Sequence, residues 1–295
     1  MKMKTLLMAG TVLAMVAACT PEGESSLGGD VGEDGASAET PQTAEMAAPG
    51  ASVDYDSVLA GEQRSAENRA RDAFRHPAET LEFFGLRPGM TVVEIAPGGG
   101  WYTEVLAGAL GPQGTLYAAH TNPESSEGAA RSVAGFDEKL AGNPVYANTE
   151  RTVFAKGNTD TLAPAGTADM VLTFRNIHNF YIGGWAPEAF SAFYTALKPG
   201  GILGVVEHRL PEDAEDARMD ESGYMKRSTV VKMAEDAGFE LVDESEVNAN
   251  PKDTADYEKG VWTLPPTLTN GETDRDKYVA IGESDRMTLK FRKPA

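Results

Sequence analysis

The chain has 295 residues, of which 41% are hydrophobic and 24% are charged, a composition typical of a globular protein with a sizeable core. Its 45 acidic side chains against 26 Lys and Arg residues give a formal net charge of −19, which repels phosphate backbones and excludes nucleic acid as an expected partner. The single cysteine excludes an internal disulfide framework and any zinc or iron–sulfur site built from cysteines.

The start of the chain has the organisation of a bacterial export signal. Two lysines open it, and the apolar run over residues 6–18 is too short for a stable transmembrane helix. The run ends in the sequence VAAC, which resembles the lipobox of bacterial lipoproteins. The resemblance implies a signal peptide over residues 1–18, lipidation of Cys19 and a membrane anchor in the cell envelope, with Thr20 favouring the periplasmic face of the outer membrane. The alternative is an ordinary secretory signal with a chance cysteine.

A polar segment separates this signal from the rest of the chain. Residues 20–56 contain nine acidic side chains and no Lys or Arg, among many Gly, Ala, Ser and Pro. Such a segment buries too little apolar surface to offset the entropy lost on ordering. We therefore expect a flexible, self-repelling tether over residues 19–56 and one folded domain over residues 57–295.

Helical and strand-like segments alternate through this domain. Residues 57–84 have a helical pattern that is interrupted before Pro77, where a second helix starts. Further helices are expected over residues 101–110, 187–197 and 224–237. Short β-branched runs bounded by Gly and Pro predict seven strands, over residues 91–96, 114–120, 152–156, 168–174, 202–207, 239–247 and 287–291. Strands that alternate with helices predict an α/β domain with a mostly parallel sheet.

A glycine-rich loop follows the first predicted strand and opens a helix. Its sequence, EIAPGGG, resembles motif I of the class I S-adenosylmethionine-dependent methyltransferases, with Glu94 as the acid, Ala96 as the small residue, and Gly98 and Gly100 as the two glycines. Glycines there let the backbone approach a ligand, and the helix N-terminus contributes free N–H groups and a positive dipole. A closer resemblance, from about Arg69 to the C-terminus, is to uncharacterised predicted methyltransferases with the sequences PGGGWYTE, RNIHNF and GVWTLPPTL to GESDRMTLKF.

The resemblance implies both a fold and a cofactor. The fold is a Rossmann-like, seven-stranded, mostly parallel sheet with helices on both faces and an antiparallel last strand, and the cofactor is S-adenosylmethionine. The residues then expected at the cofactor are Glu94, Ala96, Gly98, Gly100, Trp101 and Asp160. The rival interpretation, a dinucleotide fold, requires a third glycine where this loop has Thr103 and an acid where His120 closes the second strand.

Polar side chains gather where the predicted strands end. Ligands bind beyond the carboxyl ends of the strands in an open parallel sheet, so these side chains are candidates for a site. The candidate catalytic residues are Arg175, His178, Asn179, Glu207 and His208. His178 is the expected general base, because a methyl acceptor must lose a proton, and Arg175 and Arg209 are the expected clamps for an anionic substrate. The alternative is that these groups satisfy one another around a degenerate site.

The same histidines raise the question of a metal site. His120, His178, His208 and Glu207 are residue types that bind metal ions. We expect no metal, because the second strand lies across the sheet from the fourth and fifth and because no HxH or HExxH spacing occurs.

A long segment over residues 248–285 interrupts the pattern before the last strand. It is rich in Pro, Gly, Asp and aromatic residues, and Trp262, Pro265 and Pro266 argue against disorder. We expect it to form a lid or a wall of the substrate site.

Functions of different classes remain open at this point. The first is a lipid-anchored S-adenosylmethionine-dependent methyltransferase that acts on a small-molecule acceptor. Because S-adenosylmethionine is made in the cytoplasm and the signal directs the chain outward, the second is a periplasmic binding or scaffold module that keeps the fold and binds a nucleoside or an anionic ligand. A third is chemistry other than methyl transfer on the same fold. Fold alone does not separate these functions.

Overall fold

The computed structural model describes residues 52–295, so the predicted signal peptide, Cys19 and most of the tether lie outside the described residues. The first helix, α1, begins at Tyr55, two residues before the predicted start of the domain. Its start is fixed by Asp54, whose side chain caps the helix by accepting the Ser57 N–H at 3.2 Å. Within residues 52–295, every helix is too short or too polar to cross a membrane.

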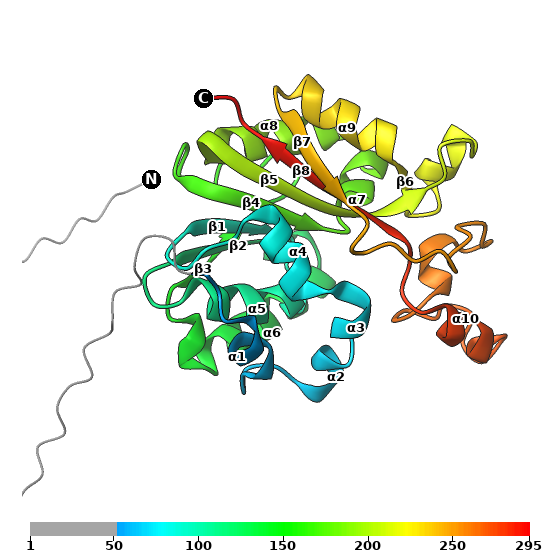
Figure 1. Ribbon diagram of the computed structural model, residues 1–295, viewed down its shortest axis with the longest axis horizontal. Coiled ribbons are helices and arrows are strands. Elements are labelled where there is room, and N and C mark those ends of the chain that lie inside the picture. The colour runs from blue at the N-terminus through cyan, green and yellow to red at the C-terminus, as the bar shows by residue number, and fades with distance from the viewer. Residues whose placement is uncertain (1–51) are drawn as a thin grey trace, which may run out of the picture. The chain divides into compact units, whose positions relative to one another are not determined.

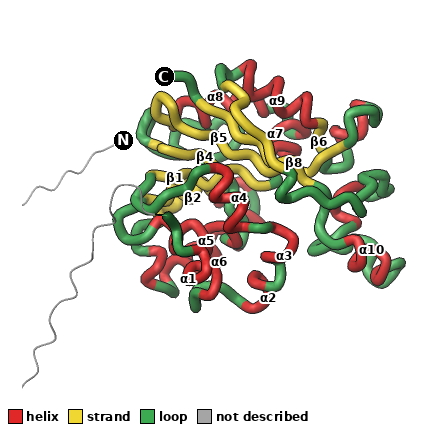
Figure 2. Tube along the Cα trace, in the orientation of Figure 1, coloured by secondary structure: helices red, strands yellow, loops and turns green. Residues whose placement is uncertain are grey.

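Eight strands form one sheet between two layers of helices (Figure 1, Figure 2). The order across the sheet is β3-β2-β1-β4-β5-β8-β7. Strands β1 to β5 pair in parallel, and β8 is antiparallel to both of its neighbours. The strands are β1 (Thr91–Ile95), β2 (Thr115–His120), β3 (Thr149–Val153), β4 (Ala168–Phe174), β5 (Leu197–Leu210), β6 (Met225–Lys226), β7 (Glu240–Ser245) and β8 (Arg286–Arg292). The predicted α/β fold with an antiparallel last strand is confirmed.

Helices cover both faces of this sheet because neighbouring strand residues point to opposite faces. Val92 packs in a cluster with α1, α4 and α5, and the next residue, Val93, packs in a cluster with α7, α8 and α9. The α-helices of the described residues are α1 (Tyr55–Ala60), α2 (Ala66–Arg69), α3 (Asp72–Arg75), α4 (Pro77–Phe84), α5 (Trp101–Leu110), α6 (Glu127–Ala141), α7 (Ile177–Ile182), α8 (Ala186–Ala196), α9 (Arg227–Asp236) and α10 (Arg275–Ile281). Burial on both faces explains the continuous apolar runs of the central strands.

The bounds of the third and fifth predicted strands differ most from the structure. The third strand, predicted over residues 152–156, ends at Val153 because Ala155 and Asn158 form a tight turn in which the Ala155 N–H donates to the Asn158 carbonyl at 3.0 Å. The fifth strand begins five residues earlier than predicted, at Leu197, because the expected Lys-Pro-Gly-Gly turn continues along β4 as an irregular part of β5.

The strand β6 was not expected. Its residues Met225 and Lys226 belong to the segment predicted as the start of a helix, but Met225 pairs with Arg209 at the end of β5. This pairing holds the two residues in an extended conformation, so α9 begins only at Arg227.

The long segment before β8 is ordered and tied to the domain. The Asp253 carboxylate accepts the Tyr224 hydroxyl at 3.0 Å and the Asp285 N–H at 2.8 Å. The Asn250 N–H donates to the Asp285 carboxylate at 2.8 Å, so the two ends of the segment lie together. Helix α10 lies away from the sheet (Figure 1). The segment therefore has a fixed stem next to the carboxyl ends of β4 and β5.

Candidate active site

The loop between β1 and α5 forms one wall of a cavity of about 450 Å³ at the carboxyl ends of the strands. Ala96, Gly98 and Gly99 line the cavity. A Cβ built on Gly98 or Gly99 has no atom within 4 Å, so the backbone of both residues is open to a ligand. The φ of Gly98 is 57°, in the region that favours glycine. This open backbone is the strongest feature of the predicted cofactor site.

Gly100 has a different role from Gly98. Its φ is 82°, and a Cβ on it would lie 3.0 Å from the Lys139 side chain and 3.1 Å from the Phe136 ring. It does not line the cavity. Gly100 therefore lets α6 pack closely against the start of α5.

Glu94, expected at the cofactor, lies buried beneath the loop and does not line the cavity. Its carboxylate accepts the Thr103 hydroxyl at 2.6 Å. Burial raises the pKa of Glu94 to about 7, although the bond from Thr103 and the charge of Lys139 oppose the shift. Thr103 occupies the position at which a dinucleotide fingerprint has its third glycine, and here its side chain is needed to satisfy Glu94.

His120 supports the same loop from β2. Its Nδ1 accepts the Thr121 N–H at 2.8 Å, so the ring proton is assigned to Nε2, which lies 3.2 Å from the Gly98 carbonyl. Burial lowers the pKa of His120, which favours the neutral ring that this arrangement uses. His120 therefore positions the loop and does not join the other histidines.

Trp101 lines the cavity, as expected, and connects the loop to the N-terminal helices. Its indole N–H donates to the Asn68 carbonyl at 2.9 Å. The Arg75 guanidinium lies 4.5 Å from the centre of its ring, within range of a cation–π interaction. The N-terminal helices thus cover the start of α5.

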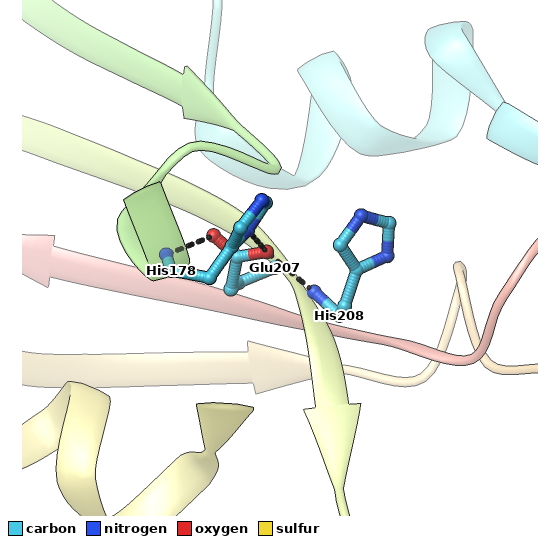
Figure 3. Close-up of side chains that lie close together, drawn as sticks. All are labelled: His178, Glu207 and His208. Carbon is cyan, nitrogen blue, oxygen red and sulfur yellow. Dashed lines mark hydrogen bonds and ion pairs between the residues drawn. The ribbon is translucent and has the colours of Figure 1, made fainter. Parts of the chain in front are cut away.

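His178 forms a buried pair with Glu207 (Figure 3). The distance between His178 Nδ1 and the Glu207 Oε1 is 3.0 Å, and the side chains are 6% and 0% exposed. A carboxylate only accepts hydrogen bonds, so Nδ1 is the donor and Nε2 is left as the basic nitrogen of the neutral ring. His178 also lines the cavity. The pair therefore holds an imidazole in a defined orientation at the cavity wall.

The Glu207 carboxylate holds the polypeptide as well as the ring. Oε2 accepts the N–H groups of Ile177 at 2.5 Å and His178 at 3.3 Å, and Oε1 also accepts the His208 N–H at 2.8 Å. Glu207 therefore caps the start of α7 and joins the ends of β4 and β5. Because it is fully buried behind His178, it supports the cavity without lining it.

His208 stands beside His178, with 5.4 Å between the ring centres (Figure 3). Its Nδ1 lies 2.6 Å from the Ser284 hydroxyl. Burial is the main cause that lowers the pKa of His208 well below its usual value, and the positive charge of Arg175 adds to it, so the ring is neutral at pH 7.

The ligand atoms of His178, Glu207 and His208 lie within 4.8 Å of one another, a spacing that by itself fits a metal ion. Two observations argue against a metal site formed by these three residues. Both oxygens of Glu207 are already occupied by N–H donors, and a cation here would be repelled by Arg175. His120, the fourth residue considered for a metal, instead contacts Gly98.

Arg175 follows β4 and lines the cavity next to His178. Its φ is 63°, a strained value for a residue other than glycine, while its N–H donates to the Val206 carbonyl at 2.6 Å. Asn176 holds the same turn against β1 by donating to the Ile95 carbonyl at 3.0 Å. Asn179, exposed on α7, also lines the cavity.

The structure brings most of the predicted site residues to one cavity. Those that line it are Ala96, Gly98, Trp101, Arg175, His178, Asn179 and His208. Asp160 lies elsewhere, in a second cavity beside Glu188. The proposed clamp Arg209 also lies elsewhere, because it pairs with Glu246 and Asp285 at 2.7 and 2.8 Å. The segment expected to be a wall contributes Trp262 to the first cavity.

Glu283 and Ser284 line the cavity and were not predicted. Glu283 accepts Arg71 Nε at 2.7 Å and Arg75 Nε at 3.1 Å. Burial opposes its ionisation, but Arg75 and Arg286, followed by other arginines, outweigh burial and hold the pKa of Glu283 at about 2. The one available signal is the run of polar residues just before the last strand.

A family described as "Methyltransferase domain" matches residues 66–244, which is more than half of the chain. The chain belongs to the methyltransferase family. This family uses S-adenosylmethionine, and the open backbone at Gly98 and Gly99 fits a cofactor that must approach the main chain closely. The binding or scaffold module without methyl transfer is not favoured by these findings.

Curated proteins with related sequences are also methyltransferases. The chain is 31% identical over 135 residues to the ubiquinone/menaquinone biosynthesis C-methyltransferase UbiE of Ectopseudomonas mendocina (strain ymp), a match that covers 45% of this chain and 47% of the relative. The chain thus spans about half the length of the curated relatives it matches.

Solved structures show the same fold at low sequence identity. A SAM-dependent methyltransferase from Aquifex aeolicus has a TM-score of 0.52 and 19% identity, with 76% of this chain and 93% of that chain covered. The [4+2]-cyclase SpnF has a TM-score of 0.54 and 16% identity, with 80% and 85% covered. At these identities the likeness concerns the fold alone.

Proposed function

We propose that the chain transfers a methyl group from S-adenosylmethionine to a small-molecule acceptor, with His178 as the general base. The observation that carries the proposal is that the open backbone of Gly98 and the paired imidazole of His178 line the same cavity. A cofactor held at one wall and a base held at another is the arrangement that positioning catalysis requires.

For methyl transfer, the protein must orient the acceptor toward the methyl group and remove one proton from the acceptor. S-adenosylmethionine, when bound, supplies an electrophilic methyl group. His178 Nε2 takes the proton of the acceptor, and Glu207 stabilises the imidazolium that forms by keeping its hydrogen bond to Nδ1 at 3.0 Å. Asn179 and the neutral His208 offer hydrogen bonds that orient the acceptor beside His178.

Calorimetric titration of the purified full chain tests the cofactor half of this proposal. We expect S-adenosylhomocysteine and S-adenosylmethionine to bind with dissociation constants on the order of micromolar. NAD, the ligand of the rival dinucleotide fold, serves as the control and is expected not to bind. A folded chain that binds NAD, or that fails to bind S-adenosylhomocysteine, contradicts the proposal.

We propose further that the chain is a lipoprotein of a bacterial cell envelope, anchored through Cys19 on the periplasmic face of the outer membrane. The support comes from the charged start, the short apolar run and the VAAC sequence. Cys19→Ser is expected to move the chain out of the membrane fraction, and Thr20→Asp to retain it in the inner membrane. Fractionation with immunodetection measures both. An unchanged membrane fraction for Cys19→Ser rules out the anchor.

A further inference from the structure

Three arginines from distant parts of the chain contact one carboxylate at the edge of the cavity, and a fourth arginine lines the same cavity. Glu283 accepts Arg71 Nε at 2.7 Å and Arg75 Nε at 3.1 Å, and Arg286 Nη1 lies 3.4 Å from it. Arg175, on the turn after β4, lines the same cavity as Arg71, Arg75 and Glu283. We call Arg71, Arg75, Arg175 and Arg286 the arginine cluster.

The charges of this cluster do not balance within the described residues. Arg286 is satisfied by Glu283 and by the carbonyls of Ser284 and Phe74. In contrast, Arg75 is 2% exposed, yet its Nη1 has no hydrogen-bond partner among residues 52–295. Over the same residues, the Arg175 guanidinium makes no hydrogen bond or ion pair. Four positive groups thus share one negative group: the buried Arg75 has an unsatisfied N–H group, which is unfavourable, and the half-buried Arg175 has no counter-ion among the described residues.

The pKa values of two of these arginines also indicate a lack of negative charge at the cluster. Burial, followed by the charge of Arg175, lowers the pKa of Arg75 to about 9, and burial, followed by the charge of Arg286, lowers the pKa of Arg175 to about 10. Both shifts are relieved by a negative group placed between the two arginines. A guanidinium matches the planar geometry of a carboxylate or phosphate, which it binds through two parallel hydrogen bonds.

Apolar side chains line the same cavity as Arg75 and Arg175. Trp262, Pro265 and Pro266 line it from the segment before β8. Trp262 is 36% exposed although it is a large apolar side chain, and its ring centre lies 6.3 Å from that of His178. A ligand that reaches Arg175 and His178 together would cover this exposed indole.

We propose that the acceptor is an organic anion whose carboxylate or phosphate group binds Arg75 and Arg175 and whose apolar or aromatic part lies against Trp262. The inference rests on the proposed methyl transfer and names the class of its acceptor. The cofactor also carries a carboxylate, so the experiment must show whether the arginine cluster binds the acceptor or the cofactor.

The test uses calorimetry on the purified full chain in low-salt buffer, with phenyl phosphate and inorganic phosphate as probes. Phenyl phosphate is expected to bind when the chain is saturated with S-adenosylhomocysteine, and about tenfold more tightly than inorganic phosphate because only the phenyl ring covers Trp262. Arg175→Gln should weaken phenyl phosphate binding at least about tenfold, because the variant loses a charge-assisted hydrogen bond to the phosphate. The affinity for S-adenosylhomocysteine should stay within about twofold of the wild type.

Two further variants keep this test interpretable. Arg209→Gln removes an arginine at the end of the neighbouring strand that lies outside the cavity, and it should leave phenyl phosphate binding unchanged. Trp262→Ala should remove the preference for phenyl phosphate over inorganic phosphate while both still bind.

Competition between phenyl phosphate and S-adenosylhomocysteine would overturn the inference, because the arginines would then bind the cofactor carboxylate. Binding of S-adenosylhomocysteine without any binding of phenyl phosphate also overturns it and leaves the proposed methyl transfer standing. Failure of S-adenosylhomocysteine itself to bind is the separate failure of the proposed function, and the inference falls with it.

Discussion

Replacing Glu207 by alanine is expected to lower the free energy of unfolding by about 3–5 kcal/mol, the cost of removing one member of a buried hydrogen-bonded pair. The carboxylate is fully buried and accepts the backbone N–H groups of Ile177, His178 and His208 as well as the His178 ring. Alanine leaves all of these donors without an acceptor and without access to water. Urea denaturation followed by circular dichroism measures the change.

Two matched variants separate this burial effect from helix capping in general. Glu207→Gln keeps one carbonyl acceptor and should cost less than Glu207→Ala. Glu212 also caps a helix, since it accepts the Ser228 N–H at 2.9 Å, but it is exposed, so Glu212→Ala should cost no more than about 1 kcal/mol. Equal losses for Glu207→Ala and Glu212→Ala would show that Glu207 acts only as a cap.

Most of the fold follows from local chemistry in the sequence. The run TVVEI is rich in apolar, β-branched residues and is flanked by Gly and Pro, and it forms β1, which ends one residue before the predicted end at residue 96. The predictions are wrong where pairing with a distant strand decides the outcome. Met225 and Lys226 have no local pattern of a strand and become one because they lie beside the end of β5. β3 is an edge strand with the polar sequence TERTV, which gives only a weak apolar pattern, so the predicted strand lies three residues too far along the chain.

Some residues of the site were predicted correctly from the expected order of the strands, and others were not. The ends of β4 and β5 were expected to be neighbours, and they bring His178 and His208 together. Arg209, one residue after His208, points to the other face because side chains alternate along a strand, and there it pairs with Glu246 and Asp285. Alternation was the available signal that His208 and Arg209 do not share a cavity.

Glu283 could not be predicted in this way. It meets Arg71 and Arg75 across more than two hundred residues of sequence, and the contact depends on how the segment before β8 folds back over the N-terminal helices. A polar run before a strand is compatible with an exposed turn, so the sequence contains no pattern that assigns Glu283 to a buried cluster. Only the tertiary structure places one carboxylate among three arginines.

Gly98→Arg is expected to weaken S-adenosylhomocysteine binding at least about 100-fold, equivalent to about 2.7 kcal/mol, while the chain remains folded. A Cβ at Gly98 has no atom within 4 Å, so the backbone tolerates a side chain sterically, but that side chain then occupies the cavity where the cofactor approaches the loop. The positive φ of 57° adds strain of about 1 kcal/mol to the folded state. Calorimetric titration measures the binding, and thermal unfolding measures the strain.

Gly111→Arg is the control, because it also places an arginine on a glycine of positive φ at an end of α5 but does not touch the cavity. Gly111 caps the other end of α5, and with a φ of 65° and a ψ of −172° it lies in a region that only glycine adopts readily, with open space around its Cβ. Gly111→Arg should therefore lose at least as much thermal stability as Gly98→Arg, and it should still bind S-adenosylhomocysteine as the wild type does. If Gly98→Arg bound S-adenosylhomocysteine within about tenfold of Gly111→Arg, the glycine loop would not be the cofactor site, and the resemblance of EIAPGGG to motif I would concern the fold alone.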